Sequence, residues 1–386
     1  MTTELASVLR RQLVEQLVDD SVLHDPDVRR AASTVPREAF LGQAIYRPSD
    51  PPGITVWTPV RRGDVPAEDW LRLTYENTTW VTQIDGVLAE DAAGPVTGGT
   101  PTSSSTLPGL ILSMIEQAGT APGKRTLIIG AGTGLSTAYV CEVVGEDNTT
   151  AVETDPAVAE RARKAVAEAG YAPTLITADG MRGYADRAPY DVVLAFCSMR
   201  HIPYGLLRQI RQGGSRLVTL AGWGFGHGLV LLTADGAGGA TGGFLPGHTS
   251  FMMARSHDRP PRGPFELLPG DERQSRIDPA LLDEWTGRFV AQLATPSAER
   301  FGVGGEQILL DIATGSQART RPAESGHGWT VIQRGPLKLW NAVEDSVALW
   351  QSHGSPHLSE FGMTVTSAAQ QVWFGGPDGP SWALPI

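Results

Sequence analysis

The stretch "TLIIGAGTGLSTAYV", residues 126–140, decides the fold of this chain. A short run of branched apolar residues, typical of a buried strand, is followed by three glycines spaced two apart and then by an apolar helical segment. Gly130, Gly132 and Gly134 let the backbone approach a ligand closely. A dinucleotide fingerprint places its third glycine five residues after its first, so this spacing weakens a nicotinamide interpretation. The alternative is an ordinary strand-to-helix turn.

The segments around this turn alternate between strand and helix patterns. Apolar runs without polar alternation are typical of a parallel sheet that is buried on both faces. The expected strands are 126–130, 149–153, 174–177, 191–196 and 215–220, with helices near 134–144, 156–169 and 203–211. The sequence therefore predicts an α/β fold with a doubly wound, mostly parallel sheet.

The residues before this region are predicted to form helices and loops. Apolar residues at three- and four-residue steps indicate an amphipathic helix over 5–17, and a second helix is expected over 27–33. Residues 35–99 are rich in loop-forming residues, and 85–99 is expected to be an exposed connection. A proline that follows several hydroxyl residues opens a further helix within 102–119.

The residues after the parallel strands are predicted to close the sheet and then form a second region. The runs 228–233 and 250–254 flank a glycine-rich piece and are expected to pair antiparallel, and 257–264 is a plausible linker. Strand-like pieces at 307–313 and 328–334 predict a mixed α+β unit. Its tryptophans, Trp340 and Trp350 among them, are most simply core residues, with contact to a peptide as the alternative.

Composition limits the function classes. The 386 residues include 41% hydrophobic and 19% charged residues, as in an ordinary globular protein. A net charge of -11 disfavours general binding to nucleic acid. Two cysteines, Cys141 and Cys197, cannot build a disulfide framework or a zinc site, and the histidines lack metal-ligand spacing, so no metal is expected. Without a signal peptide or an apolar span, we expect a cytoplasmic protein that does not bind membranes.

Two acidic residues follow the glycine turn at the ends of the next strands. Glu153 ends the second strand, where a carboxylate can accept hydrogen bonds from both ribose hydroxyls. Asp179 follows the third strand and can accept from an adenine amino group, while Gly180 lets the ring lie near the backbone. Asp155, before a proline, is better explained as a helix cap. Together with the glycine turn, these acids favour an adenosyl ligand.

At this point the chain resembles the protein-L-isoaspartate O-methyltransferases. The resemblance covers about residues 5–255 and is most specific before the glycine turn. Its blocks are "LVEQL" (13–17), "VPREAF" (35–40), "YENTTWVT" (75–82), "STLP" (105–108), "LIIGAGTG" (127–134), "VETD" (152–155), "ADG" (178–180), "PYDVVLAFCSMRHIP" (189–203) and "LLRQIRQGGSRLV" (206–218).

The resemblance implies a Rossmann-like class I methyltransferase with a seven-stranded sheet. It implies S-adenosylmethionine as cofactor and S-adenosylhomocysteine as product. The expected segments are an N-terminal helical and loop region, a cofactor-binding core and an accessory domain for the peptide substrate, over 1–100, 101–256 and 257–386. The residues expected to hold the cofactor are Gly130, Ala131, Gly132, Thr133, Gly134, Glu153, Thr154, Asp179 and Gly180.

The family places a hydroxyl residue two positions before a proline, close to the reacting carboxylate. Here this position is Thr106, where the repair enzymes have serine, and Ser105 is expected to assist it. Ser104 is expected to contact substrate. Arg200 and His201 follow the fourth strand and are candidates for holding the peptide, with solvated loop polarity as the alternative. His227 lies between glycines and is either functional or a turn residue.

The expected reaction is methylation of an aspartyl carboxylate in a peptide. The ester lets a neighbouring backbone nitrogen close a succinimide, which water opens to aspartate or isoaspartate. The residues after 255 resemble the extension of longer relatives that act on ribosomally made, ATP-grasp-cyclised peptides, so the sequence favours peptide maturation. The alternatives are repair of isoaspartyl proteins and a module that binds S-adenosylmethionine or peptide without catalysis.

Overall fold

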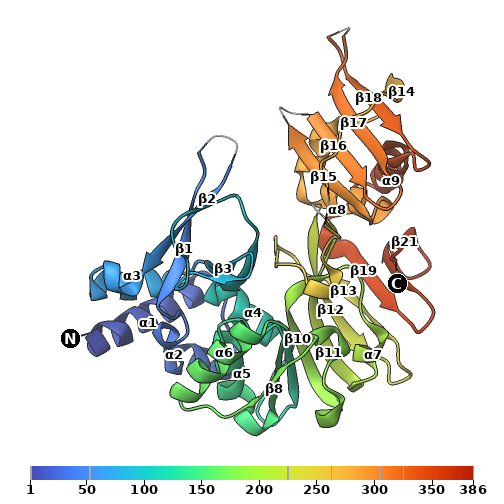
Figure 1. Ribbon diagram of the computed structural model, residues 1–386. Helices are drawn as coiled ribbons and strands as arrows, with labels where there is room; N and C mark the ends of the chain where they lie inside the picture. The colour runs from blue at the N-terminus through green and yellow to red at the C-terminus, as the bar shows by residue number, and fades with distance from the viewer. Residues whose placement is uncertain are drawn as a thin grey trace. The chain divides into compact units, whose positions relative to one another are not determined.

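The chain divides into two units, each containing β-sheet structure (Figure 1). The structure is a computed structural model and describes residues 2–51, 54–223, 226–261, 263–303, 306–324 and 326–385. Met1–Phe196 and Gln209–Leu217 belong to the first unit, and Cys197–Arg208 and Val218–Ile386 belong to the second. Strands β10 (Tyr190–Met199) and β11 (Ile210–Ala221) begin in the first unit and end in the second.

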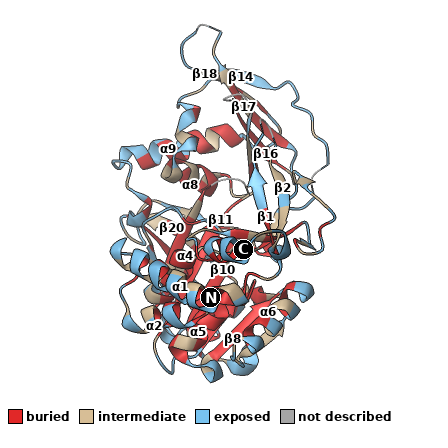
Figure 2. Cartoon of the chain, turned by 90° about the vertical axis from the view of Figure 1, so that its left-hand side faces the viewer, coloured by how far each residue is buried: buried red, intermediate tan, exposed pale blue. Residues whose placement is uncertain are grey.

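The parallel sheet of the first unit has the predicted strands. Its order is β9 (Thr174–Thr177), β8 (Thr149–Glu153), β7 (Thr126–Ile129), β10 and β11. The pairs β8–β9, β7–β8 and β7–β10 are parallel. Every residue of β7 and β8 is buried, which requires cover on both faces of the sheet. Figure 2 shows β8 buried and the outer sides of the helices exposed.

The helices of the first unit follow the predictions, except for one over Ala67–Thr74, which lies in the region predicted as loops. Helix α2 (Pro26–Thr34) begins where the Asp25 carboxylate accepts the N–H groups of Asp27 and Val28. Helices α5 (Leu135–Val144) and α6 (Pro156–Glu168) contact the parallel strands, and α6 has the same cap at Asp155. The other helices of this unit are α1 (Thr2–Asp19), α3 (Ala67–Thr74) and α4 (Pro108–Gln117).

The region predicted as loops, residues 35–99, forms most of a second sheet, so that prediction is wrong. The order is β4-β3-β1-β2-β5, with β6 paired to β3. The strands are β1 (Ala44–Ser49), β2 (Val56–Arg61), β3 (Trp80–Ile84), β4 (Val87–Leu88), β5 (Val96–Thr97) and β6 (Pro101–Ser105). Ala89 and Ala92 are buried against this sheet, so 85–99 is not merely an exposed connection. These strands are short and interrupted by prolines and charges, which hides their period.

The antiparallel pair that closes the second unit's sheet also differs from the prediction. Strand β12 (His227–Ala234) pairs with β13 (Ala240–Phe244), inside the glycine-rich run, and 250–254 forms only an isolated bridge at Met253. A Cβ at Gly242 would lie 1.9 Å from the Leu231 carbonyl oxygen, so a glycine fits there.

The sheet that contains the parallel strands continues beyond β11. Its next strands, in order, are β12, β13, β19 (Phe361–Val365), β20 (Gln370–Phe374) and β21 (Ser381–Ala383). Together with the parallel strands, this makes ten described strands, so the predicted number of seven is not confirmed. Contacts group β12 and β13 with residues after 256. The functions assigned to the three sequence segments stay predictions.

A five-stranded antiparallel sheet completes the second unit. Its order is β14 (Asp271–Gln274), β18 (Trp329–Arg334), β17 (Ser316–Pro322), β16 (Glu306–Asp311) and β15 (Ala298–Val303). Strands β16 and β18 are the two predicted pieces. Helix α9 (Leu339–Ser352) contacts β17 and β18, and α8 (Trp285–Ala294) contacts α9. Trp340 and Trp350 are buried, as the core interpretation expects.

The remaining helical pieces are short. Helix α7 (Tyr204–Leu207) covers less than the predicted 203–211, because β11 begins at Ile210. The 3-10 helices are η1 (Arg37–Ala39), η2 (Arg62–Asp64), η3 (Glu146–Asn148), η4 (Gly180–Arg182), η5 (Ala185–Arg187), η6 (Arg255–His257), η7 (Pro279–Asp283) and η8 (Leu358–Glu360). In the described part of the chain, no helix has the length and apolar character needed to cross a bilayer.

Candidate active site

The glycine turn connects β7 to α5. Gly130, Gly132 and Gly134 have φ angles of 84°, 54° and 90°, in the left-handed region that other residues rarely adopt. Ala131 and Thr133, which lie between them, are buried. The turn therefore presents glycine backbone at the carboxyl end of a central parallel strand, where ligands bind in open α/β sheets.

The carboxylate of Glu153 holds this turn. Its Oε2 accepts the N–H of Gly132 at 2.9 Å, and its Oε1 accepts the N–H groups of Thr154 at 2.8 Å and Asp155 at 3.1 Å. Only 8% of Glu153 is exposed. The parallel pairing of β7 and β8 places both strand ends at one edge of the sheet. Oε1 thus receives two backbone donors and Oε2 receives one.

Asp179 and Gly180 lie at the end of the third parallel strand. One oxygen of Asp179 accepts the N–H of Met181 at 2.9 Å and caps η4. A Cβ at Gly180 would lie 2.5 Å from Cγ2 of Ile129, the last residue of β7. Gly180 therefore has to be small because its backbone lies directly against β7, next to the glycine turn.

A hydroxyl segment, Ser103–Thr106, lies beside the glycine turn. A Cβ at Gly132 would be 3.4 Å from the carbonyl oxygen of Ser104, an ordinary contact distance, so the backbones of β6 and the glycine turn lie next to each other. Ser105 is 1% exposed, and its Oγ has no hydrogen-bond partner among the described residues. Thr106 follows β6 and is partly exposed. The predicted acceptor and cofactor residues thus meet at Ser104 and Gly132.

Two residues that the sequence analysis did not single out hold the other end of this segment. The Oγ1 of Thr79 accepts the N–H of Leu107 at 3.0 Å, and the Oδ1 of Asn77 accepts the N–H of Gly109 at 2.9 Å. These side chains satisfy donors at the start of α4, a helix without a cap from its own N-terminal residue. Both residues lie in the block 75–82 that carries the family resemblance. That block is the sequence feature from which their role could have been predicted.

Arg37, in the family block 35–40, holds the chain that carries Asn77 and Thr79. Its guanidinium is fully buried and donates to the carbonyl oxygens of Thr74 at 2.6 Å, Glu76 at 2.5 Å and Thr78 at 2.8 Å. Burial lowers the pKa of Arg37 to about 10, so the group stays charged at neutral pH. A buried charge that donates to three carbonyls makes this turn rigid.

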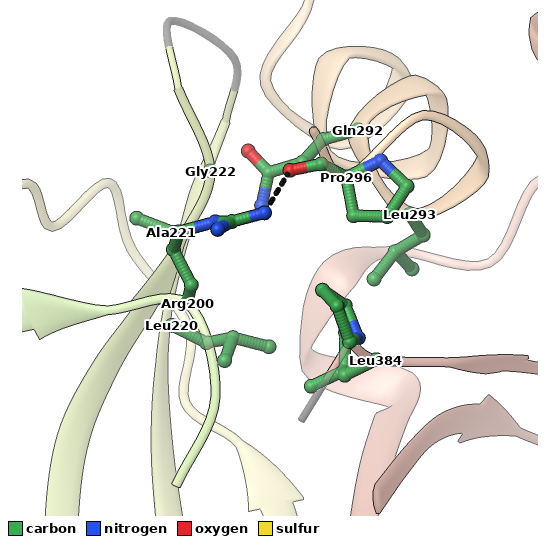
Figure 3. A pocket seen from close by; sticks show the side chains of 9 residues that line it. Arg200, Leu220, Ala221, Gly222, Gln292, Leu293, Pro296 and Leu384 are labelled. Atoms are coloured by element: carbon green, nitrogen blue, oxygen red, sulfur yellow. Dashed lines mark hydrogen bonds between the residues drawn. The ribbon is translucent and has the colours of Figure 1, made fainter. Parts of the chain in front are cut away.

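Arg200 and His201 lie in the second unit. The Arg200 guanidinium stacks 3.8 Å from the Trp223 ring centroid, and its Nη2 lies 3.1 Å from both the Pro296 carbonyl oxygen and Ser297 Oγ. Figure 3 shows this group beside Gln292 in a small cavity. Burial lowers the Arg200 pKa, with an opposing contribution from Asp311. The guanidinium thus has partners within the protein.

The imidazole of His201 lies 4.3 Å from that of His257, measured between ring centroids. Burial lowers the pKa of His201, and the charge of Arg200 lowers it further. His227 lies 3.3 Å from Ser198 Oγ and 3.4 Å from Ser250 Oγ, and burial lowers its pKa to about 4. Substrate roles for Arg200 and His201 stay predictions. Among the described residues, no group of three or more His, Cys, Asp or Glu side chains is arranged to hold a metal ion.

Comparisons with known proteins identify relatives of the part of the chain that contains the glycine turn. The family model described as Protein-L-isoaspartate(D-aspartate) O-methyltransferase (PCMT) matches residues 72–222, which include every predicted site residue. The chain is 30% identical over 238 residues to the Protein-L-isoaspartate O-methyltransferase of Hyperthermus butylicus, covering 59% of this chain and 81% of that protein. It is 29% identical over 230 residues to the enzyme of that name from Methanothermobacter thermautotrophicus, covering 59% and 87%.

A solved structure named protein-L-isoaspartate O-methyltransferase has a similar fold. It aligns with 95% of this chain and 100% of its own, with a TM-score of 0.53 and 18% sequence identity. At this identity the likeness concerns the fold. The alignment extends well beyond residue 255, so a fold of this extent also occurs in a protein with that name.

Proposed function

The chain belongs to the protein-L-isoaspartate O-methyltransferase family, and on this premise we propose that it methylates aspartyl or isoaspartyl carboxylates in peptides, with repair of isoaspartyl residues as the leading role. It is an S-adenosylmethionine-dependent carboxyl O-methyltransferase. The observation that carries the proposal is the position of the Ser104 carbonyl oxygen, 3.4 Å from where a Cβ at Gly132 would lie, because it puts the hydroxyl segment beside the glycine turn.

The residues around the turn fit the adenosyl cofactor. Bound S-adenosylmethionine supplies a methyl group on a positively charged sulfur. We assign the close backbone contacts to Gly130–Gly134, including Ala131 and Thr133, and the contacts next to the ribose to Glu153 and Thr154. Glu153 Oε2 accepts a single backbone donor, which leaves capacity for a hydroxyl. Asp179 and Gly180, at the end of the neighbouring strand, are assigned to the adenine.

The hydroxyl segment suits a carboxylate acceptor. An aspartyl carboxylate has a pKa near ~3.9, so it is ionised at neutral pH and needs no general base. The protein has to orient it, and proximity alone can contribute several kcal/mol. We assign this role to Thr106 and Ser105, with Ser104 beside them. The buried Ser105 hydroxyl has no partner among the described residues, and a buried donor in that condition costs stability unless a ligand satisfies it.

The proposal includes two kinds of substrate that carry the carboxylate: damaged proteins and modified peptides. Relatives named for isoaspartate support repair of damaged proteins. Threonine at the position of the family's serine supports a more specialised substrate, such as an aspartate in a cyclised ribosomal peptide. The region after 255 does not separate these roles, because a solved structure named for isoaspartate aligns with most of it.

The test compares three peptides of one sequence: an isoaspartyl form, an aspartyl form and a macrocycle with an ordinary aspartate. Methyl esters are detected by mass spectrometry, and kcat/KM is measured for each peptide. Turnover of the isoaspartyl form alone supports repair. Turnover of the macrocycle alone replaces repair with peptide maturation. If none of the peptides is methylated and S-adenosylhomocysteine still binds, the assignment of the acceptor is wrong, and a binding module is the remaining explanation.

For residues 257–386 we propose a peptide-binding role. A groove of about 180 Å³ is lined by Leu267, Leu268, Pro269, Gln317, Arg319, Ile332 and Arg334. Small-molecule sites are usually roughly 300–1,000 Å³, so this groove suits one or two side chains of a peptide. Its leucines and arginines match an aliphatic residue beside a carboxylate. We expect Arg334→Ala to raise KM for a long acidic peptide and to leave KM for a short peptide unchanged. Equal KM values for the wild type and the variant on both peptides would refute this role.

A further inference from the structure

We propose that Gln83 is a positioning residue that fixes the distance between the hydroxyl segment and the glycine turn. The catalytic part of this inference rests on the proposed function. Gln83 lies on β3 and is fully buried. It belongs to neither the predicted cofactor residues nor the predicted acceptor residues. Its amide connects Thr102, in the first part of β6, to Asp155, which follows the end of β8.

The two ends of the Gln83 amide have different partners. Its Oε1 accepts the hydroxyl of Thr102 at 2.8 Å. Its Nε2 donates to Asp155 Oδ2 at 3.1 Å and to the Gly86 carbonyl oxygen at 3.2 Å. Thr102 immediately precedes the hydroxyl segment, and Asp155 lies two residues after Glu153. A primary amide is suited to this position because it accepts on one side and donates on the other.

The strand pairing is irregular on both sides of Gln83. Strands β3 and β6 pair antiparallel, with Gln83 opposite Ser103, and the register shifts between Val81 and Gln83 and again between Gln83 and Ile84. Such irregularities bend a strand and redirect a side chain, and they are common next to active sites. Here they accompany a side chain that leaves its own sheet to reach the turn after β8.

Asp155 is held on its other side as well. Its Oδ1 caps α6 by accepting the N–H groups of Ala157 and Val158, while its own N–H donates to Glu153 Oε1. Asp155 is therefore held in place by Glu153 and by the first turn of α6. A hydrogen bond from Gln83 to Asp155 couples β3 to this rigid corner.

These contacts form a closed ring. The carbonyl oxygen of Ser104 lies beside the backbone of Gly132, Gly132 donates to Glu153, Glu153 accepts from Asp155, and Asp155 accepts from Gln83. Gln83 then returns to β6 through Thr102 and its pairing with Ser103. The hydroxyl segment thus lies beside the glycine turn at Ser104 and is linked to it a second time through Gln83 and Asp155.

The test uses Gln83→Glu, which keeps the shape but puts a carboxylate against Asp155. It is compared with Gln83→Glu combined with Asp155→Asn, which restores the hydrogen bond with donor and acceptor exchanged. Asparagine also caps helices, so α6 keeps its start. Gln43→Glu, at an exposed position before β1, is the control for the change of charge. The measurements are kcat and KM for an isoaspartyl peptide, the Kd of S-adenosylhomocysteine, and hydrogen exchange at the amides of residues 103–106.

We expect Gln83→Glu to lower kcat by about tenfold to a hundredfold, the scale of an ångström-sized misplacement, with the Kd of S-adenosylhomocysteine changed less than about threefold. Amides 103–106 should exchange faster, and the double variant should recover most of both losses. An unchanged kcat would overturn the proposal, as would equal losses of turnover and cofactor affinity without recovery in the double variant. If the wild type methylates none of the peptides, the proposed function fails, and unchanged hydrogen exchange in Gln83→Glu would then overturn the positioning role by itself.

Discussion

Replacing Glu153 by glutamine tests the cofactor site most directly. The two side chains have nearly the same shape, but glutamine has one acceptor oxygen where glutamate has two. In the structure, Oε1 accepts the N–H groups of Thr154 and Asp155, and Oε2 accepts the N–H of Gly132. If the glutamine oxygen serves the first two donors, its NH₂ group faces the N–H of Gly132. The variant then loses the acceptor for Gly132 and the site for a cofactor hydroxyl.

The expected loss of affinity follows from the number of acceptor sites. A carboxylate has about four lone-pair sites, and three are taken by backbone donors, so one remains for a ribose hydroxyl. The sequence analysis expected two hydroxyls at this carboxylate. One charge-assisted hydrogen bond is worth about 1.5–3 kcal/mol, which raises Kd by about tenfold to 150-fold. Two such bonds would raise Kd by about 150-fold to about 20,000-fold.

The same substitution affects the protein without cofactor. Leaving the Gly132 N–H without an acceptor should lower the free energy of unfolding by about 1–3 kcal/mol. Urea unfolding of the apoprotein measures this term, and calorimetry with S-adenosylhomocysteine measures Kd. Glu160→Gln, on the exposed side of α6, is the matched control and should change neither quantity. An unchanged Kd in Glu153→Gln would remove Glu153 from the cofactor site, and a rise beyond about a thousandfold would refute the single-hydroxyl argument.

Three further substitutions test other parts of the molecule. Thr106→Val keeps the shape but removes a hydroxyl, so we expect kcat for peptide to fall while the Kd of S-adenosylhomocysteine is unchanged; equal losses in both would place Thr106 in the cofactor site, and Thr106→Ser should retain activity. Arg37→Lys cannot serve three carbonyl oxygens in the same geometry and should lower the free energy of unfolding by about 1–3 kcal/mol, measured in urea. An unchanged urea midpoint would contradict the role given to this guanidinium. Burial lowers the pKa of His227 from 6.5 to about 4, so its stabilising contribution is complete above pH 6.5 and is lost as the pH falls toward 4. His227→Gln should therefore remove about 3 kcal/mol of the stability difference between about pH 7 and about pH 4, measured by urea unfolding at both values. The same pH dependence in the wild type and the variant would show that His227 does not cause it.

The sequence by itself determined the parallel sheet and the glycine turn. Every residue of β7 and β8 is buried, so neither strand shows the polar alternation of a half-exposed strand, and β7 ends in the apolar run Leu127–Ile129. The glycines adopt positive φ angles, which restricts those positions to glycine and makes the turn visible in the sequence. Glu153 ends its strand directly, so its place followed from the strand order.

Only the tertiary structure decided the second sheet, the glycine-rich strand and the contacts that hold the hydroxyl segment. Strands β1 to β5 are short and obtain their stability from cross-strand partners, so their own residues have no clear period. Glycines in β13 indicate a loop until β12 lies against them. Gln83 and Asp155 are 72 residues apart in the chain, and Arg37 and Thr78 are 41 apart. Hydrogen bonds over such separations depend on where the backbone places each partner, and a local sequence pattern does not contain that information.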